Sequence, residues 1–241
     1  MPVCLLTLKE EGLNYYKTGS GKAIVLLHGW GASGELMLPI ARAIPNYTYV
    51  VPDLYGHGHT RHPDRPLTLD DYVSMVMILL KREKVDKAIF ICHSFGGRIG
   101  IKIATRYPEV VERLILCDSA GLRPKKGFKY YTKRLNYIIR KRFGFSLDRC
   151  GSADFRVLKG EIRNTFKNVV AYHQDDEIND IKCPTLIVWG KKDKDTPMYM
   201  AKRLNKKING SKLVVMKGVG HFSYAEDLKT FKRIVTKFLE S

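Results

Sequence analysis

The chain has 241 residues, of which 44% are hydrophobic and 27% are charged, with a formal net charge of +18. This length and balance are typical of a folded globular protein with a large core, and they exclude an intrinsically disordered one. Ten Lys and Arg residues against one Asp lie between Arg123 and Arg149. Strong positive charge can attract nucleic acids. However, the sequence has no zinc-finger, RNP-type or helix-turn-helix pattern, so we expect no nucleic-acid partner.

The sequence shows no targeting or membrane segment. The N-terminal residues lack a basic region followed by a long apolar stretch, so we expect no signal peptide. No apolar run approaches the roughly 20 residues of a membrane span, so no stable membrane insertion is expected. The cysteines form no CxxC pair or disulfide pattern, which favours buried thiols in a cytoplasmic protein; they are Cys4, Cys92, Cys117, Cys150 and Cys183.

Apolar patterning predicts strands that alternate with helices. Short apolar or alternating runs predict strands at 3–9, 13–18, 23–27, 47–51, 88–92, 111–118, 184–189 and 212–216. Helical spacing predicts helices near 36–44, 72–80, 99–107, 198–207 and 224–238. Such alternation is typical of an α/β fold, in which a mostly parallel sheet carries helices on both faces.

The alternation breaks between Ser119 and Lys182. Apolar residues there are spaced three or four apart with Lys and Arg between them, which indicates an amphipathic basic helix; they are Phe128, Tyr131, Leu135 and Ile138. Further helices are expected at 153–159 and 160–172. We interpret this segment, about 120–182, as a helical cap inserted into a single domain that spans 1–241.

A strand-to-helix turn at Ser94 is the first candidate for catalysis. The apolar run Ala88–Cys92 precedes the turn, and Gly96 and Gly97 follow it. This is the pattern of the G-x-S-x-G nucleophile elbow, where small residues two positions before and after the serine relieve crowding. Here Cys92 stands in place of the first glycine.

A serine hydroxyl needs a base to accept its proton, a carboxylate to orient that base, and N–H donors for the oxyanion. In an open parallel sheet these groups gather at the carboxyl ends of strands. Asp193 and Asp195 follow one predicted strand, and Asp118 ends another, so all three are candidate acids. The pair Gly220-His221 follows the last predicted strand and supplies a candidate base. The loop His28-Gly-Trp-Gly31 follows an early strand and supplies candidate donors.

Four spaced motifs now occur in order: His28-Gly-Trp-Gly31, Asp53-Leu-Tyr-Gly-His-Gly58, Cys92-His-Ser-Phe-Gly-Gly97, and Gly190-x-x-Asp193 with Gly220-His221. With these motifs the chain resembles the α/β-hydrolase superfamily from about Gly12 to Leu239, in the group with a short helical cap. The resemblance implies the α/β-hydrolase fold, with Ser94 as nucleophile, His221 as general base and Asp193 as orienting carboxylate. It also implies an oxyanion hole made by the backbone N–H groups of Trp30 and Phe95.

Other polar residues are given structural roles. We expect His28 and His93 to be structural and Asp53 to anchor a loop. The loop histidines, His57, His59 and His62, lie close together in sequence but lack a supporting carboxylate cluster, so no metal site is expected. No cofactor is expected either. Gly29, Trp30 and Phe222 are expected to contact the substrate.

The sequence therefore predicts a carboxylesterase-like serine hydrolase (EC 3.1.1) that acts on a small acyl compound through an acyl-enzyme on Ser94. Hydrolysis of C–C, thioester or peptide-type bonds by the same triad stays open. So does a ligand receptor that keeps the fold without activity. The basic cap motivates a substrate with an anionic group, recognised by Lys125, Lys126 and Lys129, although a solvated face or binding to an anionic surface are alternatives.

Overall fold

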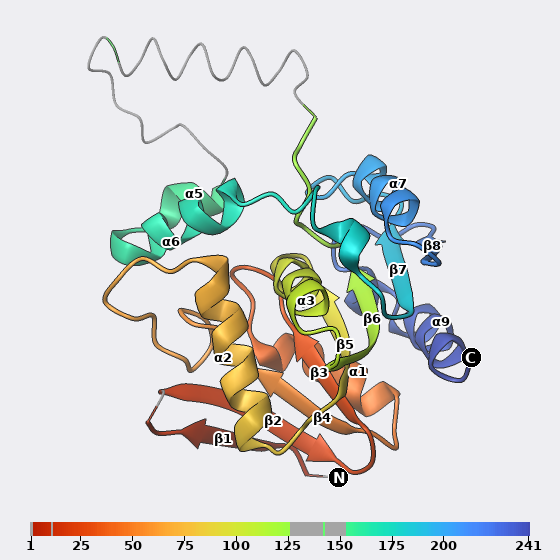
Figure 1. The fold of residues 1–241 in the computed structure, drawn as a ribbon, viewed down its shortest axis with the longest axis horizontal. Coiled ribbons are helices and arrows are strands. Elements are labelled where there is room, and N and C mark those ends of the chain that lie inside the picture. The colour runs from red at the N-terminus through yellow and green to blue at the C-terminus, as the bar shows by residue number, and fades with distance from the viewer. Residues whose placement is uncertain (1, 11, 126–141, 143–152) are drawn as a thin grey trace.

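A computed structural model of the chain describes residues 2–10, 12–125, 142 and 153–241 (Figure 1). Within them, eight strands form one sheet in the order β1-β2-β4-β3-β5-β6-β7-β8. The strands are β1 (Cys4–Leu8), β2 (Leu13–Gly19), β3 (Ala23–Leu27), β4 (Thr48–Pro52), β5 (Ala88–His93), β6 (Val111–Cys117), β7 (Thr185–Gly190) and β8 (Lys212–Met216). Pairing is antiparallel between β1, β2 and β4 and parallel from β4 to β8.

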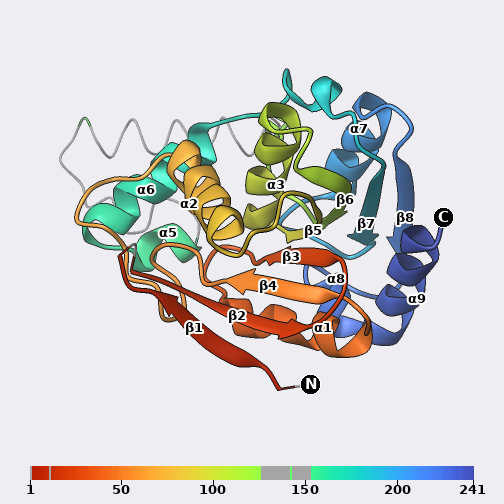
Figure 2. The same cartoon turned by 60° about the horizontal axis from the view of Figure 1, so that its bottom comes forward.

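Helices cover both faces of this sheet (Figure 2). Three of these helices pack on one face: α2 (Leu69–Arg82), α3 (Phe95–Arg106) and α7 (Met198–Lys207). On the other face lie α1 (Leu38–Ala43), α8 (Ser223–Glu226) and α9 (Leu228–Leu239). The α/β-hydrolase fold expected from the sequence is therefore present.

Side-chain alternation explains why both faces need cover. In β3, Val25 and Leu27 pack into the core under α2 and α3, whereas Ile24 and Leu26 pack into the core under α1 and α9. Successive side chains of a strand point to opposite faces, so a continuous apolar run buries both. The run 23–27 could be stable only in the middle of a covered sheet.

The strand order places the functional loops. Chain progression runs from β3 outward to β4, but then returns to β5 on the other side of β3. Such a reversal opens a crevice at the carboxyl ends of the two strands on either side of it. The loops after β3 and β5, which carry Trp30 and Ser94, therefore lie next to each other.

Between β6 and β7 the structure describes α5 (Ala153–Val157), α6 (Gly160–Ala171) and a short 3-10 turn, Ile178–Asp180. Figure 1 shows α5 and α6 at the end of the molecule where α2 begins. The hydroxyl of Thr165 in α6 accepts the N–H of Leu67 at 2.7 Å, and the Asn168 amide donates to the Leu67 carbonyl at 3.1 Å. The expected basic helix with Phe128, Tyr131, Leu135 and Ile138 lies outside the described residues, as do Lys126, Lys129 and Cys150.

The structure differs from the predicted elements in two places. The last helix is divided at Asp227, whose carboxylate accepts the N–H of Thr230 at 3.0 Å, so Tyr224 belongs to α8 and not to α9. The first predicted helix is shorter, because Gly34–Met37 forms a 3-10 turn and Leu36 is 52% exposed. In both cases a local cap or turn interrupts a pattern that is apolar at helical spacing.

Cys92 is accommodated in the elbow by a glycine in the helix that follows. A Cβ atom at Gly100 would lie 2.5 Å from Cys92 Sγ, and Cys92 itself is fully buried. The Cys92 side chain, which replaces the elbow glycine, therefore occupies the space beside α3 that Gly100 leaves empty.

We expect Gly100→Ala to destabilise the protein by about 1–3 kcal/mol, because a methyl group would overpack the contact with Cys92. In a Cys92→Ala background the same change should be tolerated, since alanine favours a helix over glycine by about 1 kcal/mol. Urea unfolding of the four proteins of this cycle measures the coupling. Additive effects of the two substitutions would contradict the proposed contact.

Candidate active site

Ser94 occupies a sharp turn between β5 and α3. Its φ of 49° and ψ of −110° lie in a region that side chains rarely adopt, so surrounding contacts must hold it. The Ser94 N–H donates to the Cys117 carbonyl at 3.1 Å, and the Gly96 N–H donates to the His28 carbonyl at 3.0 Å. A Cβ atom at Gly96 would lie 2.3 Å from the Leu27 carbonyl, so this position requires glycine.

Ser94, His221 and Asp193 meet in a line of hydrogen bonds. The Ser94 hydroxyl lies 3.0 Å from His221 Nε2, and His221 Nδ1 lies 2.9 Å from Asp193 Oδ2. The carboxylate only accepts, so Nδ1 carries the proton and Nε2 is free to accept one from Ser94. The side chain of Asp193 is fully buried and that of His221 is 13% exposed. These residues come from three separate loops, which follow β5, β7 and β8.

The loop that carries Asp193 is held by its own neighbours. The backbone N–H groups of Asp195 and Thr196 donate to Asp193 Oδ1 at 2.8 and 3.0 Å, and the Thr196 hydroxyl lies 2.5 Å from Oδ2. The Trp189 indole N–H donates to the Thr196 carbonyl at 2.7 Å. The carboxylate is therefore fixed before His221 adds its own hydrogen bond.

A close backbone approach brings the acid and base loops together. A Cβ atom at Gly190 would lie 1.9 Å from the Gly220 carbonyl oxygen, so no side chain fits there. The Lys192 N–H donates to the Val219 carbonyl at 2.9 Å across the same contact. The close approach of the Gly220 carbonyl thus explains why the motif Gly190-x-x-Asp193 begins with glycine.

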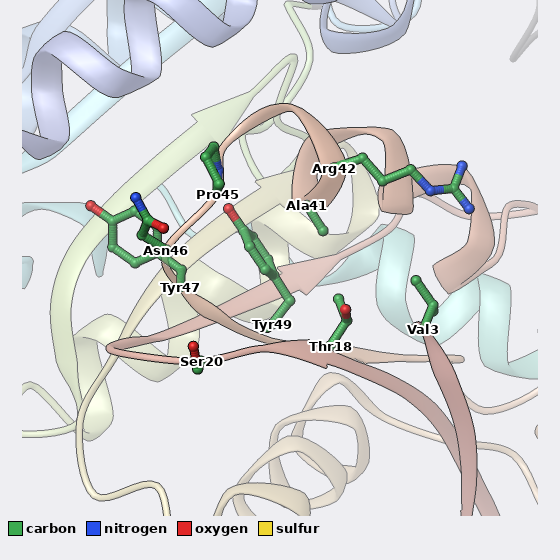
Figure 3. Close-up of a pocket in the computed structure, with 10 residues that line it drawn as sticks. Val3, Thr18, Ser20, Ala41, Arg42, Pro45, Asn46, Tyr47 and Tyr49 are labelled. Carbon is green, nitrogen blue, oxygen red and sulfur yellow. The ribbon is translucent and has the colours of Figure 1, made fainter. Parts of the chain in front are cut away.

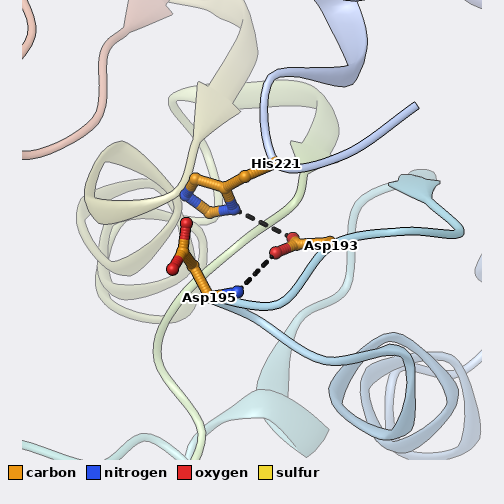
Figure 4. Close-up of side chains that lie close together, drawn as sticks. All are labelled: Asp193, Asp195 and His221. Atoms are coloured by element: carbon orange, nitrogen blue, oxygen red, sulfur yellow. Dashed lines mark hydrogen bonds and ion pairs between the residues drawn. The ribbon is translucent and has the colours of Figure 1, made fainter.

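The competing acids, Asp195 and Asp118, are placed differently. Figure 4 shows the Asp195 carboxylate near the His221 ring, and one N or O atom from each of Asp193, Asp195 and His221 lies within 4.8 Å of the others. However, Asp195 is exposed, and His221 Nδ1 bonds to Asp193. Asp118 is buried and accepts the Gly190 N–H at 2.7 Å and the Ser223 hydroxyl. Asp118 therefore supports the acid strand and the start of α8 from behind.

The charges of this cluster shift several pKa values. Burial lowers the pKa of His221, but the hydrogen bond and charge of Asp193, with Asp118 and Asp195 further away, raise it above its ordinary 6.5. Burial raises the pKa of Asp193, but hydrogen bonds from His221 and Thr196 outweigh it, so this carboxyl titrates below its usual range. Burial raises the pKa of Asp118 to about 7, despite the hydrogen bonds from Ser223 and Gly190.

The expected oxyanion donors lie beside Ser94. Phe95 is the first residue of α3, where a backbone N–H has no partner within the helix. Trp30 stands in the loop after β3, and its ring packs 5.2 Å from that of Phe95. Among the described residues, no hydrogen bond occupies either backbone N–H. Both groups are thus available to a carbonyl oxygen.

The remaining histidines make supporting contacts. His93 Nε2–H donates to the His221 carbonyl at 2.8 Å, and burial together with the nearby His221 lowers the pKa of His93 to about 3. His28 accepts the N–H of Leu54 at 3.0 Å, and burial lowers its pKa to about 3 as well. Both rings are therefore neutral and hold loops in place.

The loop after β4 is organised by Asp53. Its carboxylate accepts the N–H groups of Gly34 at 2.7 Å and His59 at 2.9 Å. His57 Nδ1 pairs with the Tyr55 carbonyl at 3.0 Å, whereas His62 bonds to the Thr165 hydroxyl at 2.8 Å. These side chains are thus engaged in separate contacts with the protein.

A pocket of about 720 Å³ opens above Ser94. The expected substrate contacts Gly29, Trp30 and Phe222 all line it, together with His93, Phe95, Arg98, Ala120, Phe155, Phe166, Val169, Val170, Asp195, Thr196 and His221. Aromatic and aliphatic side chains form most of the wall, and Trp30 packs 5.0 Å from Phe166 of α6. The space is suited to an organic molecule with an apolar part.

A second hollow of about 300 Å³ lies elsewhere, between β2, β4 and α1 (Figure 3). Its wall includes Thr18, Arg42, Asn46 and Tyr47, and it contains none of Ser94, Asp193 and His221. It has no acid–base pair, so the pocket at Ser94 is the candidate active site.

Two residues of the site were not anticipated from the sequence. Thr196, three positions after Asp193, bonds to its carboxylate from both backbone and side chain. Arg98, four positions after Ser94, lines the pocket. Spacing along α3 could have indicated Arg98, because residues four apart share a helix face.

The fold and this site define a hydrolase of the α/β class. The chain belongs to the alpha/beta hydrolase family, whose family model matches residues 24–231. It is 26% identical over 251 residues to 2-hydroxy-6-oxo-6-(2'-aminophenyl)hexa-2,4-dienoic acid hydrolase of Metapseudomonas resinovorans, an alignment that covers 93% of this chain and 86% of that protein.

Solved structures share the fold. The enol-lactonase from Burkholderia xenovorans LB400 superposes with a TM-score of 0.78 at 22% identity, covering 99% of this chain and 100% of that one. The esterase from Exiguobacterium antarcticum gives a TM-score of 0.77 at 20% identity, covering 100% of both chains. Separately, none of the helices in the described part of this chain has the length and apolar content that crossing a membrane requires.

We expect Asp193→Asn to lower the pKa of His221, because the carboxylate that raises it loses its charge. Asp195→Asn should lower this pKa by less, since Asp195 acts through space without a hydrogen bond to the ring. NMR titration of the His221 ring measures both shifts, with exposed Asp180→Asn as a control. An unchanged pKa in Asp193→Asn would contradict the electrostatic coupling.

Proposed function

We propose that the protein is a serine hydrolase that cleaves a carboxylic ester or a related acyl compound. The observation that carries this proposal is the line of hydrogen bonds from Ser94 Oγ to His221 Nε2 and from Nδ1 to Asp193 Oδ2, at 3.0 and 2.9 Å. It lies beside the backbone N–H groups of Trp30 and Phe95, which donate to no acceptor in the described part of the chain, at the floor of a largely apolar pocket. These are the parts that acyl transfer through serine requires.

In the proposed reaction, Ser94 Oγ attacks the carbonyl carbon while His221 Nε2 accepts the hydroxyl proton. The N–H groups of Trp30 and Phe95 donate to the oxygen that becomes negative. His221 then donates its proton to the leaving group, which departs and leaves an acyl group on Ser94. In the second half, His221 deprotonates a water molecule that attacks this ester, and the acid is released as the serine regains its proton.

Asp193 has two tasks in this scheme. Its hydrogen bond holds the His221 ring in the tautomer that leaves Nε2 free, and its charge stabilises the imidazolium formed during each half-reaction. The pKa of Asp193 lies below its usual range, so it stays ionised at neutral pH. The uncharged Thr196 hydroxyl holds the Asp193 carboxylate in place without neutralising its negative charge.

The bond that is cleaved is the open part of the proposal. Thioesters, C–C bonds and peptide-type bonds are alternatives for the same three side chains, and the named relatives are hydrolases of different compounds. We place carboxylic esters first because their hydrolysis needs only a nucleophile with its base and oxyanion donors. The pocket provides both, through Ser94 with His221 and through the N–H groups of Trp30 and Phe95. A panel of esters and thioesters with varied acyl chains ranks these classes.

The proposal includes the setting of the enzyme. We infer one α/β domain over residues 1–241 with a helical cap at about 120–182, supported by the contacts of α6 with the core. A small molecule is the proposed partner, with no nucleic acid. A cytoplasmic location is supported by the free thiols of Cys92 and Cys117, which are buried in the core.

Ser94→Ala should abolish stoichiometric labelling by a fluorophosphonate and lower kcat on the best ester by at least about 10⁴-fold. Mass spectrometry of the labelled protein and chromogenic ester assays measure the two effects. Ser119→Ala, a change of a nearby buried serine, is the matched control and should retain labelling. A folded wild-type protein that resists the reagent would refute the enzyme and favour a ligand receptor.

The rate constant kcat/KM should rise with pH through the pKa of His221, because only the neutral ring accepts the Ser94 proton. This pKa is raised, so the rise should be centred above pH 6.5. Asp195→Asn removes a charge that raises it, and should move the rise to lower pH. A profile centred below pH 6.5 in the wild-type protein would contradict His221 as the base.

A further inference from the structure

A buried cation forms part of the wall of the pocket at Ser94. Arg98 stands on α3, four residues after Ser94, and is only 7% exposed. Burial lowers the pKa of its guanidinium to about 10, so the group is still protonated at neutral pH. A positively charged side chain therefore lines the same pocket that holds the proposed nucleophile.

This guanidinium is incompletely paired. It has five N–H donors, but among the residues that the structure describes its one hydrogen bond is from Nη1 to the backbone carbonyl of Tyr172. That carbonyl ends helix α6, where a cation is favourable. The contact explains part of the position of Arg98, but it provides no negative charge.

Carboxylates that lie close to α3 or act on Arg98 are engaged with other groups. Asp70 forms ion pairs with Lys102 at 2.9 Å and Arg106 at 2.6 Å. Asp175 attracts Arg98 through space, but its carboxylate lies 2.7 Å from Arg203 and accepts the N–H of Arg123 at 2.8 Å. In the described part of the chain, Arg98 thus has no carboxylate within ion-pair distance.

A buried charge without a partner is unfavourable unless something else pairs with it. A planar guanidinium with free donors binds a carboxylate through two parallel hydrogen bonds, and does so more strongly in an apolar surrounding. Around Arg98 the pocket wall is largely aromatic and aliphatic, with Phe155, Phe166 and Val169 from the α5–α6 segment. The missing partner can therefore be supplied by a ligand in the pocket.

The only other unpaired charge in this wall, among the described residues, is Asp195 beside His221. A negative group on the substrate would be repelled there and attracted to Arg98. The two charges thus favour one orientation, with the scissile carbonyl at Ser94 and the anionic end directed toward Arg98.

We propose that Arg98 is the binding site for a carboxylate of the substrate, so that the enzyme acts on acyl compounds that carry a carboxylate a few bonds from the scissile carbonyl. The proposal rests on the serine hydrolase function proposed above. It differs from the expectation that Lys125 in the cap recognises an anion. Lys125 is exposed, and its ammonium lies 4.9 Å from the centre of the Tyr199 ring.

The test compares esters that differ only in one charge. Monoethyl adipate and its neutral amide, ethyl adipamate, place the carboxylate on the acyl side, while 5-acetoxypentanoate and 5-acetoxypentanamide place it on the alcohol side. We expect the wild-type enzyme to prefer the anionic member of one pair at least about tenfold in kcat/KM. Equal rates for both members of both pairs would overturn the proposal.

Arg98→Gln should reduce this preference about 10- to 100-fold, because the charge is removed while a donor to Tyr172 is kept. Hydrolysis of the neutral ester should fall much less than that of the anionic ester, and Arg98→Lys should keep part of the preference. Arg106→Gln, which removes the same charge from α3 outside the pocket, should leave the preference intact. An equal loss on both esters would show that Arg98 only anchors α6, and would overturn the proposal.

A second measurement uses the wild-type protein alone and requires no turnover of substrate. Adipate should slow the labelling of wild-type Ser94 by a fluorophosphonate, whereas adipamide at the same concentration should not. Equal protection, or none, would overturn the anion site. Absence of labelling would instead refute the serine hydrolase, and calorimetric binding of adipate to the folded chain would then decide on Arg98 by itself.

Discussion

The backbone turn at Ser94 is the constraint on which the rest of this site depends. A residue with a side chain and a φ of 49° is stable there only because three neighbouring strands hold it. The Cys117 carbonyl of β6 accepts its N–H, and the His28 carbonyl after β3 accepts the N–H of Gly96. Since β3, β5 and β6 are adjacent and parallel, the same pairing that builds the core also fixes the hydroxyl. Loss of this strand pairing would therefore also displace Ser94.

The acid and base reach Ser94 through a comparable backbone contact. Gly190 lies against the Gly220 carbonyl with no room for a side chain at position 190, and this contact brings the loops after β7 and β8 together. Asp118 then supports both from behind, through the Gly190 N–H and the Ser223 hydroxyl. A buried carboxylate that never touches His221 thus contributes to its position and to its raised pKa. The pKa of His221 thus depends on side chains at the ends of β6, β7 and β8, and not on the pair Asp193 and His221 alone.

Above this rigid floor the pocket combines apolar walls with two separated charges, Arg98 and Asp195. The floor holds the groups of the proposed acyl transfer, whereas in our proposal the two charges orient the substrate. Arg98 also binds the end of α6 through the Tyr172 carbonyl. Binding of an anion and the position of the α6 segment are therefore linked through one side chain.

The sequence by itself determined the strands, most helices and the loops that carry Ser94, Asp193 and His221, because apolar periodicity and glycine turns are local properties. Its motif spacing favoured Asp193, but Asp118 and Asp195 also follow strands. Only the tertiary structure showed which carboxylate lies 2.9 Å from the His221 ring. It also showed that Gly100 makes room for Cys92, that Asp227 divides the last predicted helix, and that the buried Arg98 forms no ion pair with a carboxylate in the described ranges. These features depend on contacts between residues that are distant in sequence or on different elements, where periodicity carries no information about distance.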